Sequence, residues 1–577
     1  MKRRDFVLKS VVSAAAAALI PSTLKGETPG QASLTGNPLR FPPVLQQGQQ
    51  LTLSTTNAEV WPGQLTEVIA LNGSYPGPTI KVKRGEEFSV VFNNQHSEEA
   101  TIHWHGLLVP ELMDGQPKDA VLPGASYTYT FAVTQRAGTY FYHSHAHHIT
   151  GKHVYKGFAG FFIIEDDDEL QLGLPAGEFD VPLVIQDRRS ANIPQFTYQP
   201  AMVDNMLGYI GNTALVNGTP DAYLEVHKTL YRFRLLNGSN ARIYHIAFSD
   251  NTPFTIIGTD SGLKDEAVQV NSVYLAPGER LEILADFSNH QQGTSVNLIS
   301  LAFTAPGLQG DAITLMRFDI TGTQSSGGVI PQSLPAISYY NYADKLRTRE
   351  FILSQGTMAT GMHRINDKVY DMNRIDEVVQ INELEEWKFI NTTNLYHPMH
   401  IHGVMFQVYS RGGSTTLGPN DKGWKDTVLV FPNETVGVLA KFTDHAGIFL
   451  MHCHILEHED MGMMMNFRIE GEPTTGTDDE GKPSGFALEQ NYPNPFNPST
   501  VIGYAVGRRA LVELELYDIQ GSMIARPVSR VQEPGSYSVR VDFSGQGLSS
   551  GMYIYRMKAT AEGRTLFMKS GKMEYIK

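Results

Sequence analysis

Hydrophobic and polar positions alternate along many short stretches of this chain, and turn residues separate the stretches. Phe88, Val90 and Phe92 recur at every second position, as do Trp387 and Phe389. A period of two indicates half-buried strands, and short strands with regular turns are typical of β-sandwiches. The 53 glycines and 31 prolines supply the turns. The pattern therefore predicts an all-β protein made of Greek-key sandwiches.

One plan recurs three times along the chain, in residues 72–106, 217–248 and 366–403. Each copy has a turn, an extended stretch, an alternating strand, a turn with asparagine and a strand with histidine. A chain of 577 residues is too long for one core. We therefore predict three repeated sandwich domains. Their expected bounds are residues 45–165, 170–325 and 345–470.

Beyond Glu470 the composition changes. Residues 471–485 are polar and rich in Gly, Pro and Thr, which predicts a linker. Val512, Leu514 and Leu516 alternate in the segment that follows, so residues 486–577 should form a small immunoglobulin-like sandwich. This segment contains no histidine or cysteine, and its sequence indicates no chemistry.

The first 26 residues have the layout of a signal peptide, with a basic start and an Ala-rich apolar core. Arg3 and Arg4, followed by "DFVLK", resemble a twin-arginine signal, and an ordinary Sec signal is the alternative. We expect an exported protein, in the periplasm, on the cell surface or secreted.

Composition and charge exclude several other classes of function. The formal charge of -14 and the lack of a long basic run argue against nucleic-acid binding. No apolar run is long enough to predict a membrane span in the mature chain. The single cysteine excludes an intramolecular disulfide. We expect a soluble monomer.

Ten of the 19 histidines fall in four short motifs. Residues i and i+2 of a strand share a face, so each His-x-His pair directs two imidazoles to one place. A single pair would be explained by structural histidines, but four pairs in two similar domains predict a metal centre of Cu, Zn, Fe or Ni. The repeat at 217–248 has no His-x-His pair, and His245 is the single histidine of its last strand, so the first and third domains should build the centre. The four motifs are "HWHG" (His103, His105), "HSH" (His143, His145), "HPMHIHG" (His397, His400, His402) and "HCHILEH" (His452, His454, His458).

The only cysteine, Cys453, indicates which metal. A thiolate with two histidines and a weak axial methionine is a blue-copper electron-transfer site. His458 and Met463 follow Cys453 in one loop, and His397 is the expected fourth ligand. Zinc also accepts Cys and His, but it gives no reason for a methionine at this spacing.

The motif "HCH" predicts a link between two metal sites. In an extended chain His452 and His454 face one way and Cys453 faces the other. An electron accepted at the Cys453 site would therefore pass through the backbone to whatever the two histidines bind.

These motifs resemble those of the multicopper oxidases, the laccase-like and cuprous-oxidase-like enzymes built from three cupredoxin domains. The resemblance covers residues 45–470 and implies four copper ions. Copper nitrite reductases share the fold, but their two-domain layout does not match. The resemblance implies a type 1 copper on His397, Cys453, His458 and Met463, a type 2 copper on His103 and His400, and two type 3 coppers, one on His105, His143 and His454 and the other on His145, His402 and His452.

The same resemblance implies an oxidase that couples one-electron oxidation of a small reducing substrate to four-electron reduction of O₂ to water. Glu459 and Asp114 fall where the family's proton-relay acids sit, although each could be a solvated surface acid. For Asp426 we expect a structural hydrogen-bonding role. His147, His148 and His153 should line the edge of the cluster.

The substrate is less clearly indicated. Cuprous oxidases of this family carry a Met-rich insert and an Asp/Met pair before the third histidine motif. Here Thr393 and Leu395 stand in place of that pair, and no long Met-rich helix is present. We therefore favour phenols and similar organic donors, with bilirubin compatible. Cu(I) oxidation for copper tolerance and a non-catalytic copper-binding surface or scaffold protein are the alternatives.

The C-terminal segment, with "NYPNPFNPST" at its start, resembles the sorting domain of the type IX secretion system. This resemblance implies passage across the outer membrane by the export machinery and removal of the tail. A small adhesive sandwich without a sorting role is the alternative. A twin-arginine signal with such a tail is an unusual pairing.

Overall fold

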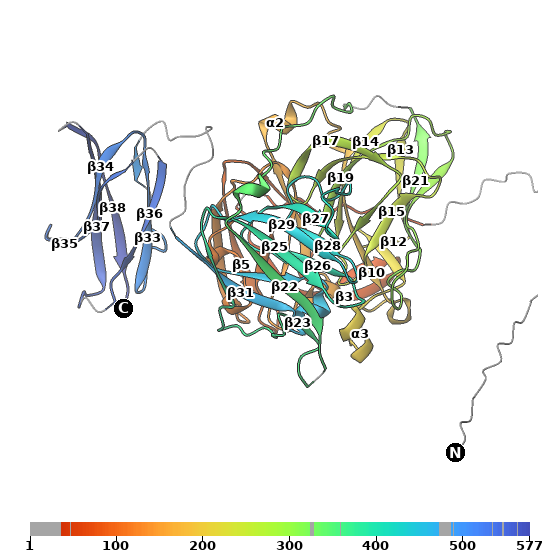
Figure 1. Ribbon diagram of the computed structural model, residues 1–577, viewed down its shortest axis with the longest axis horizontal. Helices are drawn as coiled ribbons and strands as arrows, with labels where there is room; N and C mark the ends of the chain where they lie inside the picture. The colour runs from red at the N-terminus through yellow and green to blue at the C-terminus, as the bar shows by residue number, and fades with distance from the viewer. Residues whose placement is uncertain are drawn as a thin grey trace, which may run out of the picture. The chain divides into compact units, whose positions relative to one another are not determined.

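The computed structural model describes residues 36–577, except residues 47, 324–327, 358, 472–485, 489, 533–534, 545–546 and 562–563. The predicted signal peptide and nearly all of the predicted linker lie outside the described residues. The described chain consists mostly of strands, with a few short helices, which confirms the prediction of an all-β protein (Figure 1). No helix in this part of the chain is long and apolar enough to cross a membrane.

The first sandwich consists of two four-stranded sheets, with strand orders β3-β2-β5-β7 and β4-β9-β8-β6. Phe88, Phe92, Trp104 and Phe162 from the two sheets meet in one buried core. The strands are β2 (Leu51–Trp61), β3 (Gln64–Leu71), β4 (Ile80–Lys83), β5 (Glu87–Asn94), β6 (Ile102–His105), β7 (Ser126–Ala132), β8 (Gly138–Ser144) and β9 (Ala159–Glu165).

The second sandwich is the largest, with sheets of six and seven strands. The short strand β1 near the start of the described chain joins its six-stranded sheet by pairing with β13. The strands are β1 (Asn37–Pro38), β10 (Asp180–Arg188), β11 (Thr213–Val216), β12 (Thr219–Pro220), β13 (Ala222–His227), β14 (Leu230–Asn237), β15 (Tyr244–Phe248), β16 (Phe254–Thr259), β17 (Gly262–Val270), β18 (Ser272–Leu275), β19 (Arg280–Asp286), β20 (Ser295–Ser300) and β21 (Ile313–Gly322).

The third sandwich consists of two five-stranded sheets, β23-β22-β25-β29-β27 and β24-β31-β30-β26-β28. Trp387 and Phe389 are fully buried in its core. The strands are β22 (Arg347–Gln355), β23 (His363–Ile365), β24 (Glu377–Gln380), β25 (Leu384–Asn391), β26 (His397–Ile401), β27 (Phe406–Arg411), β28 (Thr427–Val430), β29 (Thr435–Lys441), β30 (Gly447–Cys453) and β31 (Met464–Glu470).

The C-terminal segment has its own core, in which Val512, Leu514 and Leu516 are buried. Its sheets have the orders β32-β33-β36 and β35-β34-β37-β38. The strands are β32 (Ala487–Leu488), β33 (Ser499–Val506), β34 (Ala510–Tyr517), β35 (Met523–Gln532), β36 (Gly535–Asp542), β37 (Gly551–Ala561) and β38 (Arg564–Tyr575).

The repeat seen in the sequence reappears in the strand pairing of the three larger sandwiches. Each has a parallel pair in one sheet, β2–β5, β10–β14 and β22–β25, and an equivalent pair in the other sheet, β4–β9, β13–β21 and β24–β31. The second sandwich has a further parallel pair, β1–β13. Parallel neighbours need a crossover connection, so each sandwich passes its chain between the two sheets in the same way.

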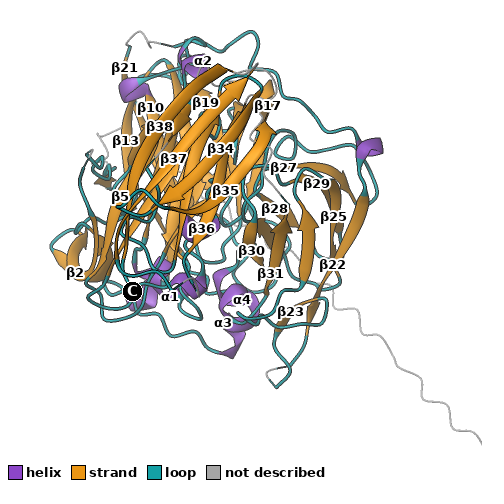
Figure 2. Cartoon of the chain, turned by 90° about the vertical axis from the view of Figure 1, so that its left-hand side faces the viewer, coloured by secondary structure: helices purple, strands orange, loops and turns teal. Residues whose placement is uncertain are grey.

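Helices α1, α3 and α4 lie together at one end of the three sandwiches (Figure 2). The α-helices are α1 (Thr150–Lys156), α2 (Asp167–Leu170), α3 (Met202–Leu207) and α4 (Leu456–Asp460), and the 3-10 turns are η1 (Glu111–Met113), η2 (Pro117–Asp119), η3 (Gly177–Phe179), η4 (Ser190–Asn192) and η5 (Tyr342–Asp344).

Candidate metal centre

In the first sandwich, the antiparallel pair β6–β8 places two of the histidine motifs side by side. His103 lies opposite His143 in this pair. Trp104, between His103 and His105, is fully buried and packs edge-on against Phe88. Because side chains alternate along a strand, anchoring Trp104 in the core turns both histidines out of it.

In the third sandwich, the strand pair β26–β30 places sulfur-containing side chains on one face of the sheet and two imidazoles on the other. Met399 lies opposite Cys453, and His400 lies opposite His452. Met399 and Cys453 are fully buried in the hydrophobic core. His400 and His452 therefore point to the other face, where they meet the histidines of the first sandwich.

Eight buried imidazoles from the four motifs converge between these two strand pairs, and we call them the histidine cluster. His454 closes it, with its ring centroid 4.9 Å from that of His105 and 5.2 Å from that of His143. The closest ring nitrogens are those of His103 and His400 at 3.4 Å, His105 and His143 at 3.4 Å, His145 and His452 at 3.2 Å, and His402 and His452 at 3.2 Å.

Asp114 is buried beside the histidine cluster and holds two of its rings. Its Oδ2 accepts a hydrogen bond from Nδ1 of His402 at 2.8 Å. The Nδ1 atom of His103 lies 2.9 Å from the backbone carbonyl oxygen of Asp114 and 3.3 Å from its Oδ1. Asp114 is only 1% exposed, so it is not a solvated surface acid.

Glu459, on α4, contacts two other imidazoles of the histidine cluster, as Asp114 does for His402 and His103. Its two carboxylate oxygens lie 3.3 Å from Nδ1 of His145 and 3.1 Å from Nδ1 of His452. The side chain is 2% exposed. It too is buried against the histidine cluster, and its contacts leave the Nε2 atoms of both rings facing inward.

Asp426 joins the histidine cluster to the second sandwich. Its Oδ1 lies 3.0 Å from Nε2 of His105, so Nδ1 is the nitrogen that His105 directs to the cluster. The guanidinium of Arg280, at the start of β19, donates to both carboxylate oxygens, at 2.8 and 2.5 Å. Asp426 has the hydrogen-bonding partners expected of a structural group.

Cys453 lies in a second, smaller group that we call the cysteine site. Its Sγ is 3.5 Å from Nδ1 of His397 and 3.6 Å from Nδ1 of His458. Met463 is fully buried in the same core, and its backbone carbonyl accepts from the Cys453 amide at 3.0 Å. The cysteine site and the histidine cluster are therefore adjacent along one strand.

In both histidines of the cysteine site, the ring nitrogen that faces away from Cys453 has a hydrogen-bond partner. Nε2 of His458 donates to the carbonyl oxygen of Met206 at 3.1 Å, and Nε2 of His397 lies 3.1 Å from the hydroxyl of Thr393. A histidine that binds a metal through one nitrogen is normally oriented through the other in this way. Thr393, which stands where a cuprous oxidase would carry an acid, thus positions His397.

His363 was not singled out by the sequence, yet it is part of the cysteine site. Its ring stacks on that of His458 with centroids 3.7 Å apart, and its Nε2 donates to the carbonyl oxygen of Asn205 at 2.9 Å. It stands alone in its strand, outside any His-x-His motif, so no local pattern could have pointed to it.

The three other histidines near "HSH" lie away from the centre of the histidine cluster. His148 contacts the carbonyl oxygen of Asp460 at 2.6 Å, and His147 stacks on His148. His153 points to Glu98, where it forms a separate group with His96. The expectation that all three line the edge of the cluster is therefore wrong for His153, because α1 turns its ring toward the β5–β6 loop.

The donor set fits copper. Burial lowers the pKa of His397 to about 3, so this imidazole is in its neutral, metal-binding form. Both ring nitrogens of His454 are buried without a hydrogen-bond partner. A buried unpaired imidazole is costly, and a metal ion would satisfy it. Thiolate with imidazole suits copper among the first-row metals.

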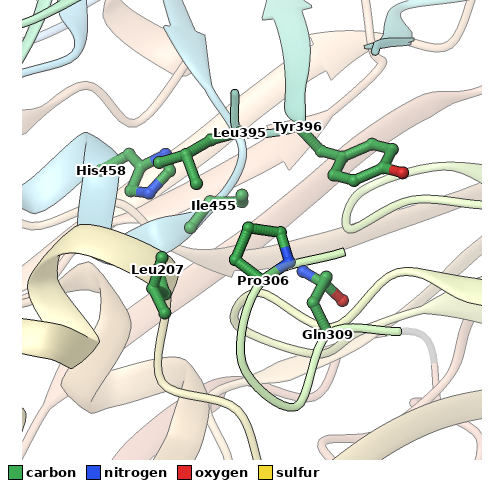
Figure 3. A pocket seen from close by; sticks show the side chains of 7 residues that line it. All are labelled: Leu207, Pro306, Gln309, Leu395, Tyr396, Ile455 and His458. Carbon is green, nitrogen blue, oxygen red and sulfur yellow. The ribbon is translucent and has the colours of Figure 1, made fainter. Parts of the chain in front are cut away.

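A small hollow lies beside His458. Figure 3 shows that α3, the loop around Pro306 and the loop that contains Leu395 surround it, with His458 on one side. It is lined by Leu207, Pro306, Gln309, Leu395, Tyr396, Ile455 and His458. Most of the residues that line the hollow are apolar, and the buried His458 forms part of its wall.

Comparison with known families identifies the class. A model described as multicopper oxidase matches residues 52–169, and a second with the same description matches residues 342–472. A third, described as a secretion system C-terminal sorting domain, matches residues 490–567. The chain belongs to the multicopper oxidase family and carries a C-terminal sorting domain, so both predicted resemblances are confirmed.

Relatives cover the three larger sandwiches. The chain is 34% identical over 436 residues to the cell division protein FtsP of Xenorhabdus nematophila, covering 74% of this chain and 90% of that protein. It is 31% identical over 493 residues to the laccase of Bacillus subtilis, covering 73% and 94%. The solved structure of the McoA multicopper oxidase of Aquifex aeolicus has a TM-score of 0.70 at 36% identity, covering 76% of this chain and all of that chain. The predicted cupredoxin-like fold and oxidoreductase class are confirmed.

The buried neutral histidines predict how the copper-free protein responds to acid. Burial lowers the pKa of His397 to about 3 and that of His363 to about 4, against about 6.5 in an unfolded chain. Below about pH 6.5 the unfolded state takes up protons that the folded state refuses, so stability falls as the pH falls. The melting temperature of the copper-free protein should drop between roughly pH 7.5 and pH 5.

The variant His363→Gln should flatten this slope, because one fewer proton is taken up on unfolding, worth about 1.4 kcal/mol per pH unit. Calorimetry of both proteins across the pH range checks this. A melting temperature that does not change with pH would contradict the burial of neutral imidazoles.

Proposed function

We propose that this protein oxidises phenolic or similar organic donors one electron at a time and uses the electrons to reduce O₂ to water. The observation that carries the proposal is the position of Cys453. Its sulfur lies between His397 and His458, and the two residues flanking it, His452 and His454, belong to the histidine cluster. One strand end therefore serves both sites.

The proposed ligand sets are those implied by the family motifs, with four copper ions in total. Bound copper would supply one-electron oxidation at the cysteine site and four-electron O₂ reduction at the histidine cluster. The sets are His397, Cys453, His458 and Met463 for type 1, His103 and His400 for type 2, and His105, His143 and His454 with His145, His402 and His452 for the type 3 pair.

The chain itself provides a short covalent path between the two sites. The Cys453 side chain connects through its own backbone to His452 and to His454. The strand pair β26–β30 fixes this path, because the amide of His454 donates to the carbonyl oxygen of Pro398 at 2.6 Å. Both sites are buried, which excludes water and limits the reorganisation that accompanies electron transfer.

Asp114 and Glu459 are the proposed proton carriers. Each is buried, and each carboxylate contacts two imidazoles of the histidine cluster. Reduction of O₂ to water consumes protons, and a positioned carboxylate can deliver them. The same contacts fix which nitrogen of each ring faces inward, so these acids also orient the ligands.

The variant Glu459→Gln tests proton delivery. Since the amide keeps the shape of the side chain but cannot carry a proton, kcat for O₂ uptake should fall by roughly 10–100-fold. Reduction of the cysteine site by donor without O₂ should keep its rate, because that step needs no proton from Glu459. Stopped-flow absorption and O₂ uptake measure the two steps.

Glu457→Gln is the matched control for this test. Glu457 lies two residues away and is equally buried, but it accepts from Tyr198, Asn240 and the Tyr209 amide. It should change kcat less than about threefold. An equal loss of activity in both variants, or an unchanged kcat in Glu459→Gln, would contradict the assignment.

The surface around His458 supports an organic donor. Leu207, Pro306 and Leu395 border the hollow, and burying apolar area of an aromatic ring there is favourable. Thr393 and Leu395 are both buried, and neither offers a carboxylate or thioether to a copper ion. A neutral phenol can place its ring against the His458 edge without leaving a buried charge unpaired.

Cu(I) oxidation remains the second candidate, and one observation favours it. Helix α3 covers His458 and exposes two thioethers, with Met202 65% and Met206 39% exposed. Thioethers are soft ligands that select Cu(I). The two methionines are four residues apart and share one face of the helix.

Two variants test whether the reducing substrate is a phenol or Cu(I). Leu207→Gln should raise KM for a neutral phenol by about tenfold, since one apolar wall of the hollow becomes polar. Met202→Leu keeps the volume but removes a thioether, so phenol oxidation should not change. The measurement is O₂ uptake with a phenol and with Cu(I). Faster turnover of Cu(I), lost in Met202→Leu, would overturn the phenol proposal.

A scaffold without catalysis is the third possibility, and the likeness to a cell division protein makes it worth a direct control. The control is Cys453→Ser in the copper-loaded protein. It should abolish both the blue absorption and donor-dependent O₂ uptake. Copper-loaded wild-type protein that takes up no O₂ with either donor would leave only the scaffold.

Export is the remaining part of the proposal. The sorting domain supports delivery across the outer membrane, to the cell surface or the medium, after export directed by the N-terminal signal. The mature secreted form should lack the first 26 residues and those after about residue 475. Intact-mass measurement of the secreted protein checks both ends.

Deletion of residues 486–577 should retain the protein in the periplasm and leave its oxidase activity intact, because no proposed ligand lies in that segment. A deleted protein that still reaches the medium would contradict the sorting role.

A further inference from the structure

His96, Glu98 and His153 form a second group of metal-binding side chains, outside the histidine cluster and the cysteine site. The Nε2 atoms of both histidines lie 3.3 Å from Oε2 of Glu98. One potential ligand atom from each residue lies within 4.8 Å of the other two. We propose that these three residues bind a divalent transition-metal ion, with zinc as the probe of choice.

The distances agree with coordination. Zinc binds imidazole nitrogen and carboxylate oxygen at about 2.0–2.2 Å in tetrahedral geometry, which places neighbouring ligand atoms about 3.3–3.5 Å apart. The two observed nitrogen–oxygen distances of 3.3 Å match this edge length. Two histidines and one glutamate are a recognised zinc set that keeps a fourth position for water.

The second nitrogen of each imidazole is held by a hydroxyl group. Nδ1 of His96 lies 2.9 Å from Oγ1 of Thr55, and Nδ1 of His153 lies 2.8 Å from Oγ of Ser144. Each hydroxyl can accept the Nδ1 proton, which leaves the Nε2 lone pair directed at Glu98. Such partners fix the tautomer and the ring orientation of metal ligands.

The surroundings give an ion a path from solvent. His96 and His153 are 7% and 0% exposed, whereas Glu98 is 31% exposed. Burial lowers the pKa of His153, which favours its neutral imidazole. Lys152 pairs with Oε1 at 2.5 Å, so Oε2 is left for the ion.

An ion at this site would restrain the strand end that carries His143 and His145 of the histidine cluster. Ser144 lies between His143 and His145 in the sequence, and its carbonyl oxygen accepts from Nδ1 of His143 at 2.8 Å. Its hydroxyl contacts His153. A metal ion on His153 would thus fix the strand end that carries two ligands of the histidine cluster. The proposed oxidase function does not depend on it.

The test is a zinc titration of the copper-loaded protein, in which the ligands of the copper sites are already occupied. Competition with a chromophoric zinc indicator should show one equivalent of bound Zn²⁺. Saturating zinc should also raise the melting temperature by roughly 2–4 °C, because the ion binds only the folded state.

Three variants test whether the bound Zn²⁺ ion occupies the site of His96, Glu98 and His153. His153→Gln and Glu98→Gln should each weaken zinc binding at least tenfold and remove the shift in melting temperature. Lys152→Met should tighten binding, because it removes a positive charge next to the ion. His290→Gln is the matched control, since His290 also pairs with a carboxylate, Asp250, at 3.0 Å but outside the proposed site.

Copper content and the blue absorption band of each variant verify that it is folded. Wild-type protein that takes up no zinc equivalent would overturn the proposal and leave Glu98 as the acceptor of a purely hydrogen-bonded network. Retention of the equivalent by both His153→Gln and Glu98→Gln, or its loss in His290→Gln, would overturn it as well.

Discussion

The strict alternation of side chains in the strand pair β26–β30 is the constraint on which the rest of the centre depends. The pairing of Met399 with Cys453 and of His400 with His452 puts sulfur in the hydrophobic core and imidazoles on the opposite face. A slip of one residue would exchange the two faces. It would bury an unpaired imidazole in the core and remove Cys453 from His397, at a large cost in free energy.

The domain interface adds a second constraint, because half of the histidine cluster comes from β6 and β8 of the first sandwich. Eight buried imidazoles in a dry interface are unfavourable unless their nitrogens find partners. Asp114 and Asp426 contact outer nitrogens of His402 and His105, and Glu459 lies 3.3 Å from Nδ1 of His145. The inner nitrogens are left for copper, so folding and metal binding are coupled in this part of the molecule.

The second sandwich has no role in the ligand set, yet it holds the centre in place. Arg280 binds Asp426 through two hydrogen bonds, and Asp426 in turn contacts His105. Truncating a buried pair of this kind is strongly destabilising, since the remaining charge is left without its partner. His245, on β15 of the second sandwich, instead stacks on Tyr274 and lies 3.0 Å from the Ser272 hydroxyl.

From short-range periodicity and spacing, the sequence predicts the β class, the threefold repeat and a metal centre on the His-x-His motifs and on Cys453, His458 and Met463. It also marked Asp114 and Glu459, through their closeness to the motifs. Three contacts are visible only in the folded molecule: His363 stacks on His458, Thr393 lies against His397, and His153 lies beside His96 and Glu98. The stacking of His363 and the group of His96, Glu98 and His153 depend on how distant segments pack. The Thr393 contact depends on a local turn. None of the three produces a periodic pattern in the sequence.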